Sequence, residues 1–278
     1  MDFTLAVEPL YSVCGFAGDL LVGMTGVGGG SLMTPLLILL FGVPPATAVG
    51  TDLLYAATTK TGGSLVHGLA RTIDWRVVRR LAAGSMPSTV LTLLVLSHFD
   101  IKGAAVSDLI TTVLSVALFV TAGLLIFRST LLALATVRVA RLSPTRTARL
   151  TVLSGVALGV LVSISSVGAG AIGVTFLVLL YPGLPLAKIV GSDIAHAVPL
   201  TLVAGIGHWV LGSVDWHIFG SLLVGSLPGI LLGSYLSARV TELALRIILA
   251  LTLTVAGGRL DLDQIHNYLS TFISSHGQ

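Results

Sequence analysis

The sequence predicts an all-α polytopic membrane protein with two inverted repeats of about five helical segments each and broken or re-entrant half-helices at the centre. Hydrophobic residues make up 54% of the 278 positions and charged residues only 10%, and the mean hydropathy is +1.00. In soluble domains about one quarter of the residues are charged. A chain as apolar as this one needs a lipid bilayer around it. A motif near residue 50 also recurs near residue 190, and short glycine-interrupted apolar runs occur at matching places in both halves.

The apolar runs define the helical segments in order. Most runs are long enough to cross a bilayer, but the second and seventh have about ten residues, half of what a spanning helix needs. The expected segments are 5–24, 32–41, 46–69, 77–97, 103–127, 150–166, 172–181, 186–211, 218–236 and 243–256.

An internal repeat relates the two halves. The sequence Val-Gly-Thr-Asp ending at Asp52 recurs as Val-Gly-Ser-Asp ending at Asp193, 141 positions later. Ordered coincidences of uncommon residues at one offset indicate a duplicated unit. Further matches at this offset are Pro44 with Pro185, His67 with His208, Asp74 with Asp215, Trp75 with Trp216, Gly84 with Gly225 and Pro87 with Pro228; upstream, after a one-residue gap near Pro182, Val27, Gly28 and Gly30 match Val167, Gly168 and Gly170.

The repeats and the arginines divide and orient the chain. We expect a first membrane repeat (1–127), a basic cytoplasmic linker (128–149), a second membrane repeat (150–258) and a short tail (259–278). Four arginines at positions 71–80 and five in the linker place both loops in the cytoplasm by the positive-inside rule. Arg239 and Arg246 favour an inverted second repeat, in which each short segment returns to the side it came from. If each broken pair crossed the membrane once, the repeats would be parallel.

Two glycine breaks are the candidate substrate site. The amides of Gly28–Ser31, and those after Ser165 and Ser166 in the second repeat, lie at the starts of short helices, where free N–H groups and the helix dipole attract anions. Close packing of glycines between membrane helices is the alternative explanation. The predicted substrate-binding residues are Gly28, Gly29, Gly30, Ser31, Thr51, Ser165, Ser166, Gly168, Ala169, Gly170 and Ser192.

A second set of candidates consists of ionisable residues within the spans. Asp52, Lys60 and His67 share an arc of roughly 80° on a helix, and Asp193 and His208 repeat the relation. Ionisable groups inside a span usually face the protein interior or a cavity. These side chains are predicted to line the transport route and to couple protons to it, or to serve local structure: Asp52 as the partner of Lys60, the histidines as interfacial hydrogen-bonding groups.

The sequence contains no signature of an enzyme. HExxH, GxSxG, Walker A and paired CxxC motifs are absent from the chain, and its histidines do not cluster at metal-ligand spacing. We therefore expect no catalytic residues, no metal, no cofactor and no nucleic-acid partner. Asp74 and Asp215 are expected to cap the helices that follow them, and the adjacent tryptophans to lie in the interfacial aromatic belt.

The glycine motif and its surroundings resemble a known family. Gly26–Gly30 (GVGGG), Pro35–Leu37 and Gly42–Ala48 (GVPPATA), with a weaker copy downstream, are similar to the sulfite exporter TauE/SafE family over about residues 14–256. The resemblance implies a multi-pass permease of the bacterial inner membrane for sulfur-containing or organic anions such as sulfite, sulfoacetate or a related sulfonate. The second copy departs from the motif, with Ala169 and Ala171 in the places of Gly29 and Ser31.

These observations predict a secondary transporter of a small anionic substrate that works by alternating access at a midplane site. Inverted repeats with short, glycine-interrupted segments are typical of this class. At roughly −150 mV, a monovalent anion gains ~3.5 kcal/mol on leaving the cell, so export needs no coupled ion. The alternatives are a proton-coupled importer of another organic anion and, in a different class, a non-transporting membrane sensor or enzyme.

Overall fold

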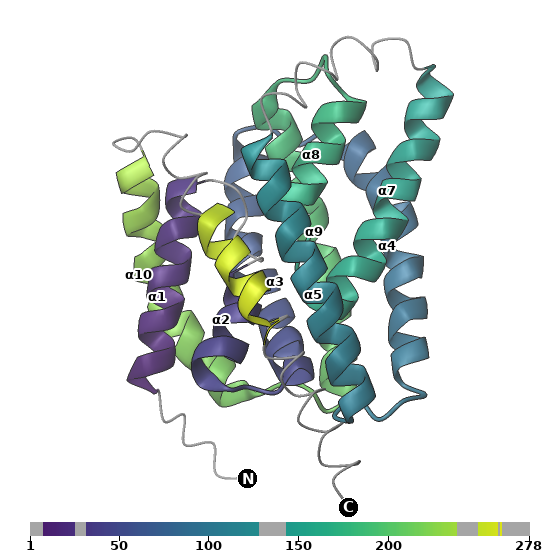
Figure 1. Ribbon diagram of the computed structural model, residues 1–278. Helices are drawn as coiled ribbons and strands as arrows, with labels where there is room; N and C mark the ends of the chain where they lie inside the picture. Colours follow the sequence, from purple (N-terminus) through teal and green to yellow (C-terminus); the bar gives the residue numbers. More distant parts are fainter. Residues whose placement is uncertain (1–7, 26–31, 128–142, 238–249, 261, 263–278) are drawn as a thin grey trace, which may run out of the picture.

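The computed structural model describes residues 8–25, 32–127, 143–237, 250–260 and 262 (Figure 1). It confirms the predicted all-α class. The first half contains α1 (Pro9–Thr25), α2 (Met33–Phe41), α3 (Pro45–Leu69), α4 (Trp75–Leu96) and α5 (Ala104–Ile126). The second half contains α7 (Pro144–Ser165), α8 (Ala171–Leu180), α9 (Leu186–Val210) and α10 (Trp216–Ser237), and residues 250–260 form a further helical stretch.

Local sequence signals determine where the helices start and stop. The short helix α2 ends at Gly42, whose left-handed backbone (φ 62°) lets its N–H and that of Val43 bond back to the last carbonyls of the helix. Prolines then open both long central helices, since Pro45 is the first residue of α3 and Pro185 precedes α9. Asp74 caps α4, as predicted, by accepting from two amides of its first turn.

The helices pair across the two halves of the chain rather than within each half. The most extensive contacts join α1 to α10, α4 to α7 and α3 to α9. In Figure 1, α1 and α10 lie side by side at one edge, α4 and α7 at the other, and α3 lies between them. Matching helices of the two halves thus exchange partners: α1 corresponds to α7, and α10 to α4.

Glycines allow these cross-pairs to approach closely at matching positions. A Cβ on Gly84 of α4 would fall on the carbonyl oxygen of Val152 in α7, and one on Gly225 of α10 would fall on that of Ser12 in α1. Gly84 and Gly225 are a matched pair of the sequence repeat. Small residues therefore permit direct backbone packing between helices, as is common in membrane bundles.

Helices α3 and α9 run antiparallel through the middle of the molecule. Gly50 near the start of α3 packs against His208 near the end of α9, and Gly191 near the start of α9 packs against His67 near the end of α3. The midpoint of the crossing on α3 lies close to Lys60. The inverted arrangement of complete repeats relative to a bilayer stays a prediction, which this antiparallel pair supports.

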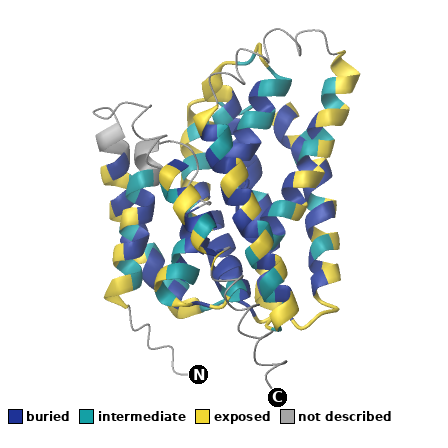
Figure 2. Cartoon of the chain, in the orientation of Figure 1, coloured by how far each residue is buried: buried dark blue, intermediate teal, exposed yellow. Residues whose placement is uncertain are grey.

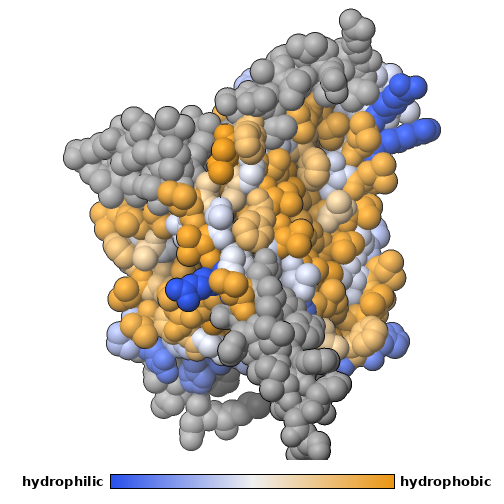
Figure 3. All heavy atoms as spheres, viewed as in Figure 1, coloured by the Kyte–Doolittle hydropathy of each residue, from blue (hydrophilic) through white to orange (hydrophobic). Residues whose placement is uncertain are grey.

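The surface is apolar between two more polar ends. Figure 2 shows exposed residues on the outer faces of the helices and buried ones toward the centre. On the face drawn in Figure 3, hydrophobic side chains dominate the middle, while strongly hydrophilic ones gather mostly near the upper and lower edges. By length and composition, four of the described helices can cross a bilayer: Ala104–Ile126, Pro144–Ser165, Leu186–Val210 and the α10 segment Trp216–Gly233. These features are those of a multi-pass membrane protein.

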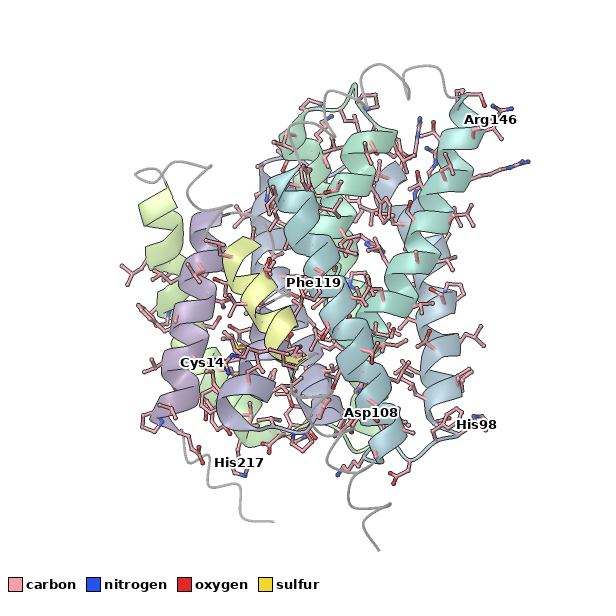
Figure 4. All side chains as sticks on the ribbon, viewed as in Figure 1. Cys14, His98, Asp108, Phe119, Arg146 and His217 are labelled. Atoms are coloured by element: carbon pink, nitrogen blue, oxygen red, sulfur yellow. The ribbon has the colours of Figure 1, made fainter. Side chains whose placement is uncertain are left out.

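The loops fall at two opposite ends of the molecule. Arg146, at the start of α7, lies at one end in Figure 4, and His98, Asp108 and His217 lie at the other.

The structure also differs from the sequence prediction at α7. This helix begins at Pro144, inside the predicted linker, because Ser143 caps it by accepting from the amide of Arg146. The remaining linker residues, 128–142, lie outside the described residues.

Candidate functional site

The turn between α7 and α8 lies in the interior of the molecule. Val167 is fully buried and Ala169 is 4% exposed. Gly168 and Gly170 have φ values of 125° and 142°, which side chains rarely tolerate, so the turn depends on both glycines. No side chain caps the N-terminus of α8 at Gly170. The amide of Gly173 donates to the carbonyl oxygen of Gly168 at 3.1 Å. The amides of Ala171 and Ile172, at the start of α8, have no intrahelical acceptor, and both residues are buried.

Helix α8 returns alongside α7 instead of continuing across. The hydroxyl of Tyr181, just after α8, lies 2.8 Å from that of Thr151 near the start of α7, and it accepts from Arg80 at 3.1 Å. Helix α7 has 22 residues and α8 only 10, and the turn that joins them is buried. The pair forms a helical hairpin whose open end lies beside Arg80. Its re-entry into a bilayer stays a prediction.

Lys60 of α3 points at this turn. Its ammonium donates to the carbonyl oxygen of Ala169 at 2.9 Å, and the residue is only 8% exposed. Asp193 and Asp52 both act electrostatically on it. The sequence predicted that Lys60 shares a face with Asp52, and the structure adds that the face is directed at the α7–α8 turn.

Asp52 is held by hydroxyl groups. Thr34, in the first turn of α2, donates to Asp52 Oδ2 at 2.6 Å. The hydroxyl of Ser166 also interacts with this carboxylate. The contact does not meet the geometry of a hydrogen bond, so Ser166 Oγ and Asp52 Oδ1 have no hydrogen-bond partner among the described residues. Asp52 therefore links α2, α3 and the α7–α8 turn.

Asp193 occupies the matching position on α9 in a different setting. Its carboxylate lies directly on the backbone of Gly173, where an added Cβ would overlap Oδ1. Among the described residues no donor equivalent to Thr34 bonds it, and Val174 stands at the matching place in α8. The two acidic residues that the sequence treats as equivalent thus differ in the donors around them.

Unsatisfied polar atoms gather around the turn. In the described part of the chain, six buried side-chain atoms have no hydrogen-bond partner, and four of these belong to Asp52, Ser166, Asp193 and His196. Buried polar groups are normally paired, so each exception needs an explanation. A concentration of such atoms beside an uncapped helix N-terminus and a lysine is the chemistry expected of a small polar ligand's site.

Thr51 and Ser192, predicted to bind substrate, each form a hydrogen bond to the other half of the chain, and their part in substrate binding stays a prediction. Ser192 Oγ accepts from the amide of Asp74 at 2.8 Å, and Thr51 Oγ1 accepts from the amide of Asp215 at 3.0 Å. Both residues are fully buried. Each hydroxyl therefore ties a central helix to the loop before α4 or α10.

We expect Thr51→Val and Ser192→Ala each to lower the free energy of unfolding by about 1–2 kcal/mol, because a buried amide loses its acceptor. The KM for the transported anion should stay within twofold of wild type. Unfolding in detergent micelles and initial rates of uptake into liposomes measure the two effects. A tenfold rise in KM with unchanged stability would instead assign these hydroxyls to substrate binding.

The two predicted histidines tie down the loops that follow their helices. His67 Nδ1 lies 2.8 Å from Thr72 Oγ1, and His208 Nδ1 lies 3.0 Å from Ser213 Oγ. His208 is buried and its Nε2 donates to the carbonyl of Ser163 at 2.9 Å. His208 thus contacts the last turn of α7, whereas His67 bonds Thr72 in its own loop. The predicted coupling role of both histidines stays a prediction.

The remaining predicted residues divide into three groups. Gly28, Gly29, Gly30 and Ser31 lie outside the described residues. Gly168, Ala169 and Gly170 form the buried turn itself. Ser165 bonds locally, donating to the carbonyl of Leu161 at 2.8 Å and accepting from the amide of Val167.

Sequence reasoning missed four polar residues near the centre. His196 is fully buried on α9 and lies 2.8 Å from the hydroxyl of Ser85. Tyr55, at the matching position on α3, donates to Asp19 at 2.7 Å, and Thr34 holds Asp52. An ionisable or polar-tipped residue inside an apolar run was the available signal for Asp19 and His196. Thr34 gave none, since threonines are common in membrane helices.

Comparisons with known proteins identify the family of the chain. The model of the family "Sulfite exporter TauE/SafE" matches residues 11–260. The chain is 39% identical over 241 residues to the "Probable membrane transporter protein YjnA" of Bacillus subtilis (strain 168), covering 86% of this chain and 94% of the relative. It is 29% identical over 246 residues to the "Probable membrane transporter protein YdhB" of the same organism, covering 87% and 95%. No solved structure matches the chain. The protein belongs to the sulfite exporter TauE/SafE family of membrane transporters.

Proposed function

We propose that the protein is a secondary transporter of the bacterial inner membrane that carries a small sulfur-containing or organic oxyanion, such as sulfite, sulfoacetate or a related sulfonate. The α7–α8 turn carries the proposal. It presents an uncapped helix N-terminus in the buried centre, beside the cation of Lys60 and the unpartnered hydroxyl of Ser166. Backbone amides and one hydroxyl can bind an oxyanion without trapping it, which suits a site that must also release its ligand.

Alternating access at this site is the mechanism we propose. The antiparallel crossing of α3 and α9, and the exchange of partners between α1–α10 and α4–α7, support two inverted repeats that meet at the centre. Transporters of this architecture open to each side by rocking one repeat or bundle against another around a fixed site. The predicted glycine break at 26–31 lies outside the described residues, and its part in that site stays a prediction.

Transport by the purified protein tests the proposal directly. Liposomes containing the protein should take up radiolabelled sulfite, methanesulfonate or sulfoacetate faster than protein-free liposomes, with the membrane potential clamped by potassium and valinomycin. Unlabelled anion on the opposite side should accelerate exchange, because a carrier must turn over its site on both faces. Absence of flux with every one of these oxyanions would refute the assignment.

Two neighbouring serines provide a sharper test of the site. We expect Ser166→Ala to raise the KM for the anion about tenfold or more, because a hydrogen bond to a charged ligand is worth about 1.5–3 kcal/mol. Ser165→Ala is the matched control, since that hydroxyl already bonds Leu161 and Val167. Equal KM values for the two variants would place the anion away from the turn.

A further inference from the structure

Asp193 is a buried carboxyl group in a setting that does not suit its charged form. The residue is 2% exposed, and its Oδ1 has no hydrogen-bond partner among the described residues. Its carboxylate packs against the backbone of Gly173, which has no side chain. A carboxylate without donors in a low-dielectric interior is strongly unfavourable, whereas a neutral carboxylic acid is not. Asp52, which has the Thr34 donor, is the better place for a negative charge.

The charged groups near Asp193 are few. Lys60 of α3 is the group that acts on it electrostatically, and Asp52 acts on the same lysine. On α9 itself, His196 follows one turn later and its Nε2 lies 2.8 Å from the Ser85 hydroxyl. Helix α8 has no ionisable side chain, and the arginines of α4 and α7 lie in the first two turns of those helices. His67 of α3 packs against Gly191, two residues before Asp193.

The charge balance of this cluster requires one proton. Lys60 supplies one positive charge and is shared by two carboxyl groups. With both carboxyl groups ionised, the buried cluster carries one excess negative charge, which would also repel an anionic substrate. With Asp193 neutral, Lys60 and Asp52 balance each other and an anion can approach the α8 N-terminus.

We propose that Asp193 is a proton-binding site and that a proton travels with the transported anion, one for each monovalent anion. This inference rests on the proposed transport function. The proton neutralises Asp193 and so removes the excess negative charge that would repel the anion. The bound anion in turn favours the neutral form of Asp193, so the two bind together and leave together. The loaded and empty clusters then have the same net charge, so transport of a monovalent anion is electroneutral and its direction follows the sum of the anion and proton gradients.

Methanesulfonate and sulfoacetate are suitable probes, because their sulfonate groups do not themselves take up protons near neutral pH. Wild-type protein in liposomes with clamped potential should acidify a lumen containing a pH-sensitive dye as the anion enters. A pH difference of one unit should accumulate methanesulfonate roughly tenfold. Asp193→Asn, which mimics the protonated form, should lose both effects, and its anion exchange should no longer fall as pH rises. Asp100→Asn, an exposed carboxylate in the loop after α4, is the charge-matched control.

The outcomes separate this proposal from the transport assignment. Anion uptake by wild type without acidification would overturn proton coupling and leave transport standing. Acidification by Asp193→Asn as in wild type would place the proton elsewhere. Absence of any oxyanion flux, sulfite included, would overturn both.

Infrared spectroscopy follows the proton on anion binding and covers a poorly transporting variant. Adding methanesulfonate to wild-type protein near neutral pH should strengthen the carbonyl band of a protonated carboxylic acid by one group, and Asp193→Asn should show no such increase. A wild-type spectrum that methanesulfonate leaves unchanged, or an equal increase in the variant, would contradict the proposal.

Discussion

Lys60→Met is expected to reduce anion uptake to below about 1% of wild type and to lower the free energy of unfolding by about 3–5 kcal/mol. The substitution preserves the length and packing of the side chain but removes the buried cation. Asp52 is left as an unbalanced charge, and the Ala169 carbonyl loses its donor. Removing one partner from a buried charge pair generally costs this much. Unfolding in mixed micelles and the liposome uptake assay measure the two effects.

A double substitution separates stability from transport in this experiment. Lys60→Met combined with Asp52→Asn restores the charge balance, so it should recover most of the lost stability while uptake stays low. Recovery of uptake in the double variant would mean that the lysine only balances Asp52. Wild-type uptake by Lys60→Met alone would remove the lysine from the mechanism altogether.

Gly84→Ala should destabilise the protein by about 3 kcal/mol, near the upper end of what overpacking usually costs. The new Cβ would fall on the backbone carbonyl of Val152 in α7, which cannot move aside as a flexible side chain would. Helices α4 and α7 must then separate along their contact. Gly225→Ala, at the matching position, should behave alike, since its Cβ would fall on the carbonyl of Ser12. Unfolding in mixed micelles measures both losses.

Gly123→Ala on α5 is the matched control for these variants. A Cβ there would meet nothing within 4 Å. Alanine reduces the conformational freedom of the unfolded chain, so this change should be neutral or stabilise the helix by up to about 1 kcal/mol. Similar losses at Gly84 and Gly123 would show that the loss at Gly84 does not come from its close contact with α7.

The fold could be predicted closely because its signals are local. Hydrophobic run lengths, Gly42, the prolines before α3 and α9 and the Asp74 cap place most helix ends within a few residues. The start of α7 was missed because the apolar run begins at Leu150, whereas the helix begins six residues earlier at Pro144. There the Ser143 cap, rather than hydrophobicity, determines the boundary.

The candidate site could be predicted only in part, because its contacts join residues far apart in sequence. The polar residues inside apolar runs identified Asp52, Lys60 and Asp193, and the glycine pattern identified the α7–α8 turn. Which neighbour each side chain meets depends on helix packing, which periodicity does not encode. The hydrogen bond between Thr51 and the loop of Asp215, for example, could not be read from the sequence.

Lys60 has no counterpart in the second repeat, where Thr201 stands at the matching position and donates to carbonyls of its own helix. The lysine lies close to the midpoint of the α3–α9 crossing, and its ammonium bonds the turn of the second repeat. One cation near a pseudo-twofold axis can serve only one of two related turns at a time. The inward-facing and outward-facing forms of such a carrier cannot be isoenergetic. The alternating access that we propose therefore implies a built-in resting orientation, and an affinity for the anion that differs on the two sides of the membrane.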